Sequence, residues 1–298
     1  MKLSILTATY NRANMLSSLY KSIKTNLGNS NLECEWIIVD DGSIDNTREI
    51  VDEFKSEEKV KIEYYFQENS GKMAAINKAV DIASGDLIVD CDSDDYFTDN
   101  AFDIIEKNAE KLVENKSLYG LIFLKAELDG SISGEKFKKE NKETTVFELY
   151  FKDNIQGEKI IVFNSKIRKK YLHEIENNEK FITEGRMYHK MDKEYKVLCI
   201  NEIIQQGDYI EGGYTKNIVD MFKKYPYGYY KYFEEILGND MRGVLFEKRV
   251  YAIKHYILFG VLTNKKMNVK SIKNVINKIL YIILYLPGVI KSKSFLNK

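Results

Sequence analysis

Residues 87–95 have the sequence Leu-Ile-Val-Asp-Cys-Asp-Ser-Asp-Asp, a short apolar run followed at once by clustered carboxylates. The apolar part is typical of a buried strand. The carboxylates of Asp92, Asp94 and Asp95 repel one another unless a cation or protons intervene. Hard cations such as Mg²⁺ and Mn²⁺ prefer carboxylate oxygens and connect phosphates to proteins. The stretch therefore predicts a strand that ends at a cation site, with a solvated acidic turn as the alternative.

The segments before and after this stretch alternate between strands and helices as far as residue 125. The apolar spacing predicts strands over residues 3–9, 35–39, 60–66, 87–89 and 119–124. It predicts helices over residues 15–27, 47–54, 71–83 and 101–113. Strands and helices that alternate with short links are typical of βαβ units. We therefore expect an α/β fold with a mostly parallel sheet flanked by helices.

Polar motifs follow three of the predicted strands. Thr9–Arg12 follows the first strand, Asp40–Ser43 the second, and Asp92–Asp95 the fourth. Taken alone, Asp40–Ser43 is an ordinary link between a strand and a helix. Ligands of parallel sheets bind beyond the carboxyl ends of the strands, so we expect the three motifs to meet in one site.

The segment Asn69-Ser70-Gly71-Lys72 is only superficially similar to a phosphate-binding loop. The first glycine of that motif would fall at Phe66, and the residue after the lysine is Met73. Lys72 near the start of a predicted helix is still placed to contact phosphate, with an ordinary surface lysine as the alternative. No GxGxxG follows the first predicted strand, which argues against a dinucleotide cofactor.

Taken together, these motifs strongly resemble those of glycosyltransferase family 2, whose members are inverting enzymes with the GT-A fold. The resemblance covers about residues 1–125 and thins out after them. It rests on four motifs in one order: Thr9-Tyr10-Asn11-Arg12, Asp40-Asp41-Gly42-Ser43-x-Asp45-x-Thr47, Asn69-x-Gly71-Lys72-x-x-Ala75-x-Asn77, and Ser84-Gly85-Asp86 leading into Asp92-Ser93-Asp94-Asp95. It implies a nucleotide-sugar donor, usually UDP-linked, and a Mn²⁺ or Mg²⁺ cofactor.

The resemblance also implies roles for individual residues. Tyr10 would flank the base, Asp41 would bind it, Asp92 would approach the ribose or the metal, and Asp94 would ligate the metal directly. The full implied nucleotide-binding set is Thr9, Tyr10, Arg12, Asp40, Asp41, Lys72 and Asp92.

An inverting transfer needs a general base that takes the proton of the acceptor hydroxyl. Members of the family often place this base in a Glu-Asp pair at a helix start, and the matching stretch here is Phe181–Arg186. Glu184 is thus the candidate base, although Gly185 stands where the second acid is expected. The alternative is that Glu184 is a carboxylate favoured by the dipole of the following helix.

The chain divides into two predicted regions. Residues 1–212 would form the GT-A catalytic domain, with a nucleotide-binding half over 1–125 and an acceptor-side half over 126–212. Residues 213–298 would form a helical extension. The charge distribution supports two regions, because the last 51 residues carry ten lysines and Arg249 but no acidic residue.

The apolar segment Ile272–Ile290 lies within this basic region. Its longest uncharged run, Ile279–Ile290, contains Pro287 and is shorter than the ~20 residues that a membrane-spanning helix needs. Lysines beside an apolar face favour a helix that lies on anionic lipid, with a helix packed on the catalytic domain as the alternative. No nucleic-acid recognition motif accompanies the basic residues, so we expect no nucleic-acid partner.

The sequence therefore predicts a metal-dependent inverting glycosyltransferase of the hexosyl- or N-acetylhexosaminyl-transferase type. The expected acceptor is a glycan or a lipid-linked molecule in bacterial surface-polysaccharide synthesis, by analogy with the family. Three scattered cysteines and no signal-peptide pattern favour a cytoplasmic protein, peripheral on the inner face of the membrane. The alternatives are a catalytically silent sugar-nucleotide binder, kept open by Gly185, and a nucleotidyltransferase, which would need a glycine-rich loop after the first strand.

Overall fold

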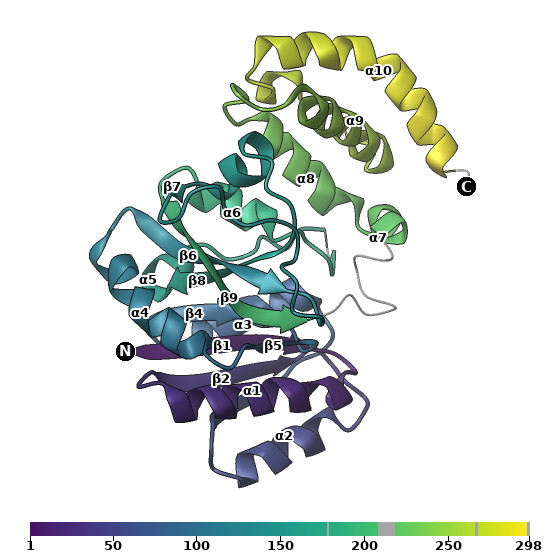
Figure 1. Ribbon diagram of the computed structural model, residues 1–298. Coiled ribbons are helices and arrows are strands. Elements are labelled where there is room, and N and C mark those ends of the chain that lie inside the picture. The colour runs from purple at the N-terminus through teal and green to yellow at the C-terminus, as the bar shows by residue number, and fades with distance from the viewer. Residues whose placement is uncertain (178, 208–217, 266–267, 297–298) are drawn as a thin grey trace.

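The computed structural model describes residues 1–177, 179–207, 218–265 and 268–296. These residues form a layered α/β fold around one mixed sheet, with further helices stacked at one end (Figure 1). The sheet order is β3-β2-β1-β4-β8-β6-β9-β5, and β7 pairs with β9. The strands are β1 (Lys2–Thr9), β2 (Glu33–Asp40), β3 (Lys61–Phe66), β4 (Leu87–Asp90), β5 (Asp95–Phe97), β6 (Leu118–Ala126), β7 (Glu143–Thr144), β8 (Lys159–Asn164) and β9 (Lys196–Gly207).

Helices cover both faces of the sheet and extend beyond it. They are α1 (Leu16–Asn29), α2 (Thr47–Ser56), α3 (Lys72–Ile82), α4 (Ala101–Glu114), α5 (Ser165–Arg168), α6 (Gly185–Met191), α7 (Ile218–Lys224), α8 (Pro226–Leu237), α9 (Phe246–Leu262) and α10 (Val275–Leu296). All nine strands and helices predicted for the first 125 residues are present, with ends that differ by a few residues. The predicted α/β class and mostly parallel arrangement over this part are confirmed.

The central strands are apolar on both faces because helices cover both faces. In β2, Trp36 and Ile38 pack with α1, α2 and α4 in one core cluster. Ile37 and Val39 point the opposite way and pack with α3 and α6 in a second cluster. All four side chains are fully buried, which accounts for the unbroken apolar run in the sequence.

The strand directions bring distant loops to one edge of the sheet. Strands β1, β2, β3 and β4 are parallel, and β8 runs antiparallel to both β4 and β6. The carboxyl ends of β1, β2, β4 and β6 therefore lie at the same edge as the beginning of β8. We call this edge of the sheet the carboxyl edge.

Several short elements were not predicted. The short strands β5 and β7 both pair with β9, and a π-helix spans Glu148–Lys152. Strand β9 reaches 12 residues, because its second half pairs with β5 and with the end of β6. These elements depend on partners far away in the chain, so local apolar spacing carries little sign of them.

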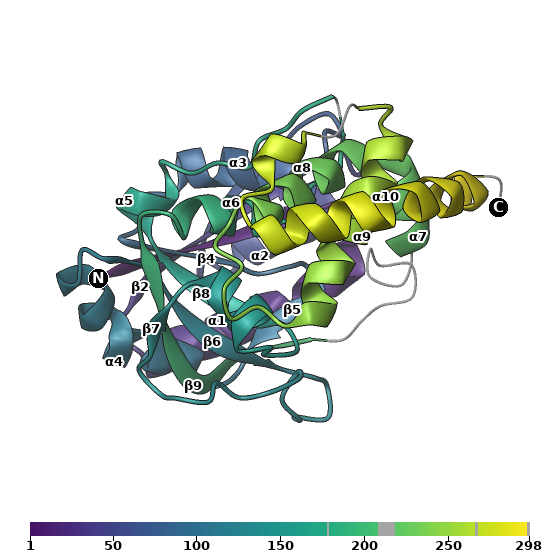
Figure 2. The ribbon, with the colours of Figure 1, turned by 90° about the horizontal axis from the view of Figure 1, so that it is seen from above.

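The C-terminal helices form a third core of their own. Helices α8, α9 and α10 pack together, and their cluster also contains Phe147, which precedes the π-helix, and Phe151, which lies within it. Figure 2 shows α10 lying across α9 on the outside of this group. The predicted helical extension is confirmed for the described residues, whereas the predicted boundary between residues 212 and 213 lies outside them.

Helix α10 is longer than the uncharged run of the sequence indicated. It continues through Pro287 over 22 residues, so the charge-free run of the sequence understated its length. Within it, Val275–Lys293 is long and apolar enough to cross a membrane by length and composition alone. The prediction that this segment is too short to span a membrane is therefore wrong.

A buried carboxylate connects β2 with the chain just before β4. Glu35 accepts hydrogen bonds from the Ser4 hydroxyl (2.6 Å) and the Ser84 amide (2.7 Å), and it also pairs with Lys2. Burial alone would raise the pKa of Glu35, but hydrogen bonds from Lys2, Ser4 and Ser84 lower it to about 2. A lowered pKa stabilises the folded chain above the pKa of the unfolded state, and this stabilisation is lost as the pH falls through the folded value.

We expect Glu35→Gln to lower the free energy of unfolding by about 2 kcal/mol at neutral pH, because charged hydrogen bonds are lost. The difference from the wild type should shrink as the pH falls from about 4.5 to about 2. Urea unfolding across that range measures it, with Glu53→Gln on the exposed face of α2 as the control. A difference that stays constant to the acid end of the range would contradict this account.

Candidate active site

A cavity of about 1010 Å³ opens at the carboxyl edge of the sheet. Its walls come from the loops after β1, β2 and β4, from the beginning of α3 and α6, and from α7 and α8. Of the predicted site residues, the following line this cavity: Thr9, Tyr10, Arg12, Asp41, Lys72, Asp92, Asp94 and Glu184. The expectation that the polar motifs of three strands meet is therefore confirmed, while their individual roles stay predictions.

Asp40 lies behind the cavity wall. Its carboxylate is buried and accepts hydrogen bonds from the Ser43 amide (2.7 Å) and the Tyr64 hydroxyl (2.6 Å). These contacts hold the turn after β2 in place. The predicted contact of Asp40 with a nucleotide stays a prediction, and the structure adds a supporting role for its side chain.

Asp41 braces the loop before α3. Its two carboxylate oxygens accept hydrogen bonds from the Gln67 side chain (2.7 Å) and from the amides of Ser70 and Gly71 (2.8 Å each). Gly71 has a φ of +98°, and a Cβ there would lie 2.1 Å from the Lys180 carbonyl oxygen. Only glycine fits at this position, which is why the short loop can deliver Lys72 to the cavity.

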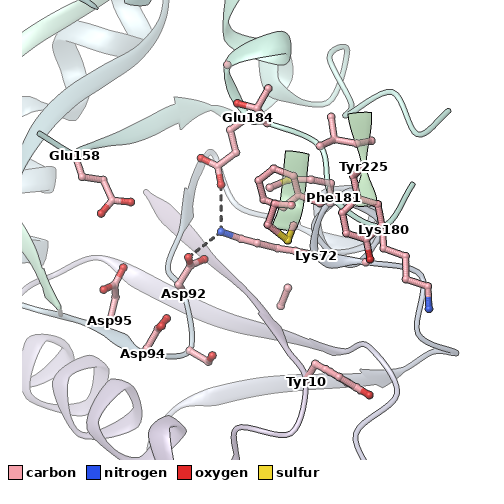
Figure 3. Close-up of a pocket in the computed structure, with 18 of the residues that line it drawn as sticks. Tyr10, Lys72, Asp92, Asp94, Asp95, Glu158, Lys180, Phe181, Glu184 and Tyr225 are labelled. Atoms are coloured by element: carbon pink, nitrogen blue, oxygen red, sulfur yellow. Dashed lines mark hydrogen bonds and ion pairs between the residues drawn. The ribbon is translucent and has the colours of Figure 1, made fainter. Parts of the chain in front are cut away.

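Three ion pairs hold the predicted metal and base residues, and Figure 3 draws the two that Lys72 makes. The Arg12 guanidinium is 2.8 Å from Asp94, and the Lys72 ammonium is 2.7 Å from Asp92 and 3.2 Å from Glu184. Burial would lower the pKa of Lys72, but the charges of Asp92 and Glu184 raise it well above its usual value. Lys72 is therefore charged and connects β4 with the beginning of α6.

Glu184 is held on both carboxylate oxygens. Besides the Lys72 contact, the Tyr188 hydroxyl donates to its other oxygen at 3.1 Å. Glu184 occupies the N-cap position of α6 but makes no capping hydrogen bond with its side chain. Its carboxylate thus faces the cavity, while its position at the start of α6 also fits the alternative of a carboxylate favoured by the helix dipole.

The glycine after Glu184 has a physical explanation. A Cβ at Gly185 would lie 2.8 Å from a ring carbon of Tyr232 on α8. The Tyr232 ring is also stacked on His189, with 5.4 Å between ring centroids. The aromatic ring therefore occupies the space in which an aspartate side chain would begin.

A third cluster was missed by the sequence argument. The Lys125 ammonium is 2.8 Å from both Asp95 and Glu158, and all three residues line the cavity. Burial raises the pKa of the Asp95 carboxyl. The one available signal was a lysine directly after the apolar run of β6, at the carboxyl end of a buried strand.

The C-terminal region also contributes to the cavity, which the sequence did not predict. Helices α7 and α8, with the residue between them, supply Met221, Lys224, Tyr225 and Tyr232 to its lining. The aromatic-rich stretch 225–233 was visible in the sequence, but nothing there showed which way its rings point. The helical extension is thus a wall of the candidate site.

The charges of the lining suit a divalent cation that arrives with phosphates. Seven carboxylates in the lining face five cations, so a bare diphosphate would meet a net negative wall. Within the described residues no group of three or more potential ligands stands ready for a metal. Mg²⁺ is commonly held by one or two carboxylates together with substrate phosphates and water. Asp92 and Asp94 fit such a site.

The profile of glycosyl transferase family 2 matches residues 4–176, more than half of the chain. The chain belongs to this family. An uncharacterized glycosyltransferase of Mycoplasma genitalium is 34% identical over 114 residues, which span 37% of this chain and 38% of that protein. The first curated relatives that match are therefore aligned over well under half of their length.

One relative aligns over most of the chain. The GalNAc(5)-diNAcBac-PP-undecaprenol beta-1,3-glucosyltransferase of Campylobacter jejuni is 26% identical over 249 residues, 81% of this chain and 75% of that protein. Among solved structures, S. aureus TarS 1-349 in complex with UDP-GlcNAc has a TM-score of 0.58. It is 20% identical and covers 98% of this chain and 81% of its own.

A second solved structure is a mannosyltransferase from Pyrobaculum calidifontis in complex with GDP-Man and Mn²⁺. Its TM-score is 0.55 at 12% identity, and the match covers 99% of this chain and 84% of that one. At these identities the two structures show a shared fold. The predicted GT-A fold is confirmed.

The contact between Gly185 and Tyr232 can be tested by measuring the free energy of unfolding of variants. We expect Gly185→Ala to lower the free energy of unfolding by about 1 to 3 kcal/mol, because the new methyl overpacks the ring. The same substitution in a Tyr232→Leu background should cost clearly less. Urea unfolding of the four proteins of this cycle measures the coupling. Additive effects would show that the ring does not limit the space at Gly185.

Proposed function

We propose that the chain is a metal-dependent inverting glycosyltransferase. It transfers a hexosyl or N-acetylhexosaminyl group from a UDP-linked nucleotide-sugar. The acceptor is a glycan or a lipid-linked molecule in bacterial surface-polysaccharide synthesis. The observation that carries the proposal is the meeting of Asp92, Asp94 and Glu184 around one cavity in a member of this family. Relatives support the donor and acceptor classes, since one is solved with UDP-GlcNAc and another is named for a PP-undecaprenol-linked glycan.

The donor would lie along the carboxyl edge of the sheet. The half-exposed ring of Tyr10 flanks the nucleobase beside the loop that Asp41 braces. Asp94 and Asp92 would hold Mn²⁺ or Mg²⁺ against the diphosphate. When bound, the cation neutralises charge that develops on the leaving phosphate oxygens. The Lys72 ammonium would reach the same phosphates, because it lies 2.7 Å from a carboxylate oxygen of Asp92.

Glu184 would act as the general base. The acceptor hydroxyl attacks the anomeric carbon from the face opposite the diphosphate, so one C–O bond forms as the other breaks and the configuration inverts. Glu184 takes the hydroxyl proton, and the nucleoside diphosphate leaves with the bonding electron pair. A diphosphate that draws Lys72 toward itself would release the Glu184 oxygen for this step.

A second candidate is a sugar-nucleotide binder without transferase activity. The observation in its favour is that Glu184 is engaged by both Lys72 and Tyr188 and has no second acid beside it. The two candidates differ in whether a proton acceptor is required. Donor binding without transfer to any acceptor, and without donor hydrolysis, would favour the binder.

Metal-dependent donor binding is the first test. A panel of UDP-glucose, UDP-galactose, UDP-N-acetylglucosamine and GDP-mannose is screened for thermal stabilisation with and without Mn²⁺. We expect Mn²⁺ to increase the stabilisation by one member, and Asp94→Ala to remove this increase. Asp103→Ala on α4 is the control, because Asp103 pairs only with Lys107 among the described residues and lies outside the cavity lining. Unchanged metal dependence in Asp94→Ala would contradict the proposed metal site.

Glu184→Gln separates the two candidate functions. We expect it to lower the transfer rate by about 10²- to 10⁴-fold and to leave donor affinity within a few-fold of the wild type. Transfer is measured as released nucleoside diphosphate together with glycosylated acceptor. Full transfer by the variant would reject Glu184 as the base.

We also propose that α10 attaches the enzyme to the cytoplasmic face of the membrane. Its inner face packs on α9 through Tyr281 and Gly288, which lies against Ile257. Its other face exposes Val275, Ile276, Ile279, Ile282, Ile283, Leu286 and Ile290. Lysines flank this apolar face, and no acidic residue occurs in the last 51 residues. This composition favours anionic lipid as the partner.

The helix would lie in the plane of the bilayer surface, because a spanning helix would have to leave α9. We expect each of Ile282→Asp and Leu286→Asp to weaken binding to phosphatidylserine-containing vesicles about tenfold. Val113→Asp, an exposed apolar position on α4, should leave binding unchanged. Sedimentation with vesicles measures the binding of each variant. If the α10 variants instead abolish self-association and vesicle binding is absent, the face is a contact between copies of the chain.

A further inference from the structure

The cluster of Asp95, Lys125 and Glu158 has no part in the proposed reaction. Lys125 is the last residue but one of the buried strand β6, Asp95 begins β5, and Glu158 directly precedes β8. The side chains of Lys125 and Asp95 are only 10% and 8% exposed, whereas that of Glu158 is 47% exposed. The cluster thus consists of a buried ion pair, Lys125 with Asp95, and one carboxylate, that of Glu158, which reaches into the cavity (Figure 3).

The buried pair is tightly constrained. A Cβ at Gly207 would lie 1.7 Å from a carboxylate oxygen of Asp95, so the Asp95 side chain fills the space that glycine leaves. Burial lowers the pKa of Lys125, but the charges of Asp95 and Glu158 raise it above its usual value. Lys125 therefore stays charged, and its ion pair with the buried Asp95 carboxylate fixes its position. It holds Glu158 by one oxygen, at 2.8 Å.

A purely structural role accounts for only part of this cluster. The Asp95–Lys125 contact already joins β5 to β6 in the buried layer. A half-exposed carboxylate such as Glu158 adds little to stability through an ion pair, because water screens the charges. The second Glu158 oxygen has no hydrogen bond to any of the described residues, so it is available to a ligand.

The order of the strands shows which part of a donor this carboxylate would meet. Along the carboxyl edge, Asp41 follows β2, Tyr10 follows β1, and Asp92 lies in the loop after β4. Glu158 comes next along this edge, directly before β8. Figure 3 shows Tyr10 and Glu158 on opposite sides of the aspartate cluster. A nucleotide-sugar with its base at Tyr10 and its diphosphate at Asp92 would therefore carry its sugar toward Glu158.

We propose that Glu158, held by Lys125 and Asp95, binds hydroxyl groups of the sugar on the donor. A carboxylate accepts hydrogen bonds from two neighbouring sugar hydroxyls, and such charged hydrogen bonds are among the stronger polar contacts. The cluster thus takes part in selecting the sugar, while Asp92 and Asp94 act on the diphosphate. This inference rests on the proposed function, since it needs a nucleotide-sugar in the cavity.

The test compares a nucleotide-sugar with its nucleoside diphosphate. The probes are the nucleotide-sugar of the panel above that stabilises the wild type most and the matching UDP or GDP, each with Mn²⁺. Calorimetric titration should show that Glu158→Ala weakens the nucleotide-sugar about tenfold and leaves the nucleoside diphosphate unchanged. Glu158→Gln, which keeps the shape of the side chain, should weaken the nucleotide-sugar by a smaller factor.

Glu148→Ala is the matched control. Glu148 is 40% exposed, pairs with Lys152 at 2.9 Å, and lies outside the cavity lining. We expect it to change neither affinity. Thermal unfolding of all three variants shows whether each is folded before it is titrated.

Two results would overturn the inference alone. One is that Glu158→Ala and Glu158→Gln weaken the nucleotide-sugar and the nucleoside diphosphate by the same factor, which would assign Glu158 to the diphosphate or to the fold. The other is that neither variant changes the preference for the nucleotide-sugar. If no member of the panel binds the wild type, the proposed function fails first and this inference fails with it.

Discussion

Crowding of carboxylates at the carboxyl edge of the sheet is the constraint on which the candidate site depends. Three aspartates lie within the five residues that follow β4, and each is paired with a basic side chain from another part of the chain. The pairs are Asp92 with Lys72, Asp94 with Arg12, and Asp95 with Lys125. Buried or half-buried carboxylates need such partners, because unpaired charges are costly away from water. The same pairs draw α3, the loop after β1 and β6 together around β4.

These ion pairs also suggest how the site responds to its substrate. In the proposed reaction, a divalent cation and a diphosphate bring charges of both signs to the edge. Arg12 and Lys72 would then exchange carboxylate partners for phosphate oxygens, while the cation takes their place on Asp94 and Asp92. The buried Lys125–Asp95 pair lies in the wall beside this exchange and would keep its geometry. In the proposed reaction the site would thus combine ion pairs that the substrate replaces with one that it leaves intact.

The C-terminal helices belong to the same physical unit as the catalytic region. The Glu179 carboxylate accepts hydrogen bonds from the amides of Tyr227 and Gly228 at the beginning of α8, at 2.7 and 2.6 Å. Tyr232 of α8 then packs against Gly185, next to the candidate base. The helices that carry the proposed membrane face therefore also line the cavity beside Glu184. Attachment to a membrane and access of a lipid-linked acceptor would involve one connected structure.

The sequence by itself determined the α/β alternation of the first 125 residues, because each strand and helix there has its own apolar spacing. It also determined which polar motifs meet at the carboxyl edge, since motifs that follow parallel strands lie at one edge of the sheet, while their roles in donor binding stay predictions. Only the tertiary structure decided the rest: Asp40 lies behind the wall, Lys125 and Glu158 join Asp95, and Tyr232 takes the space beside Gly185. These outcomes depend on contacts between segments far apart in the chain, and local spacing carries no record of them.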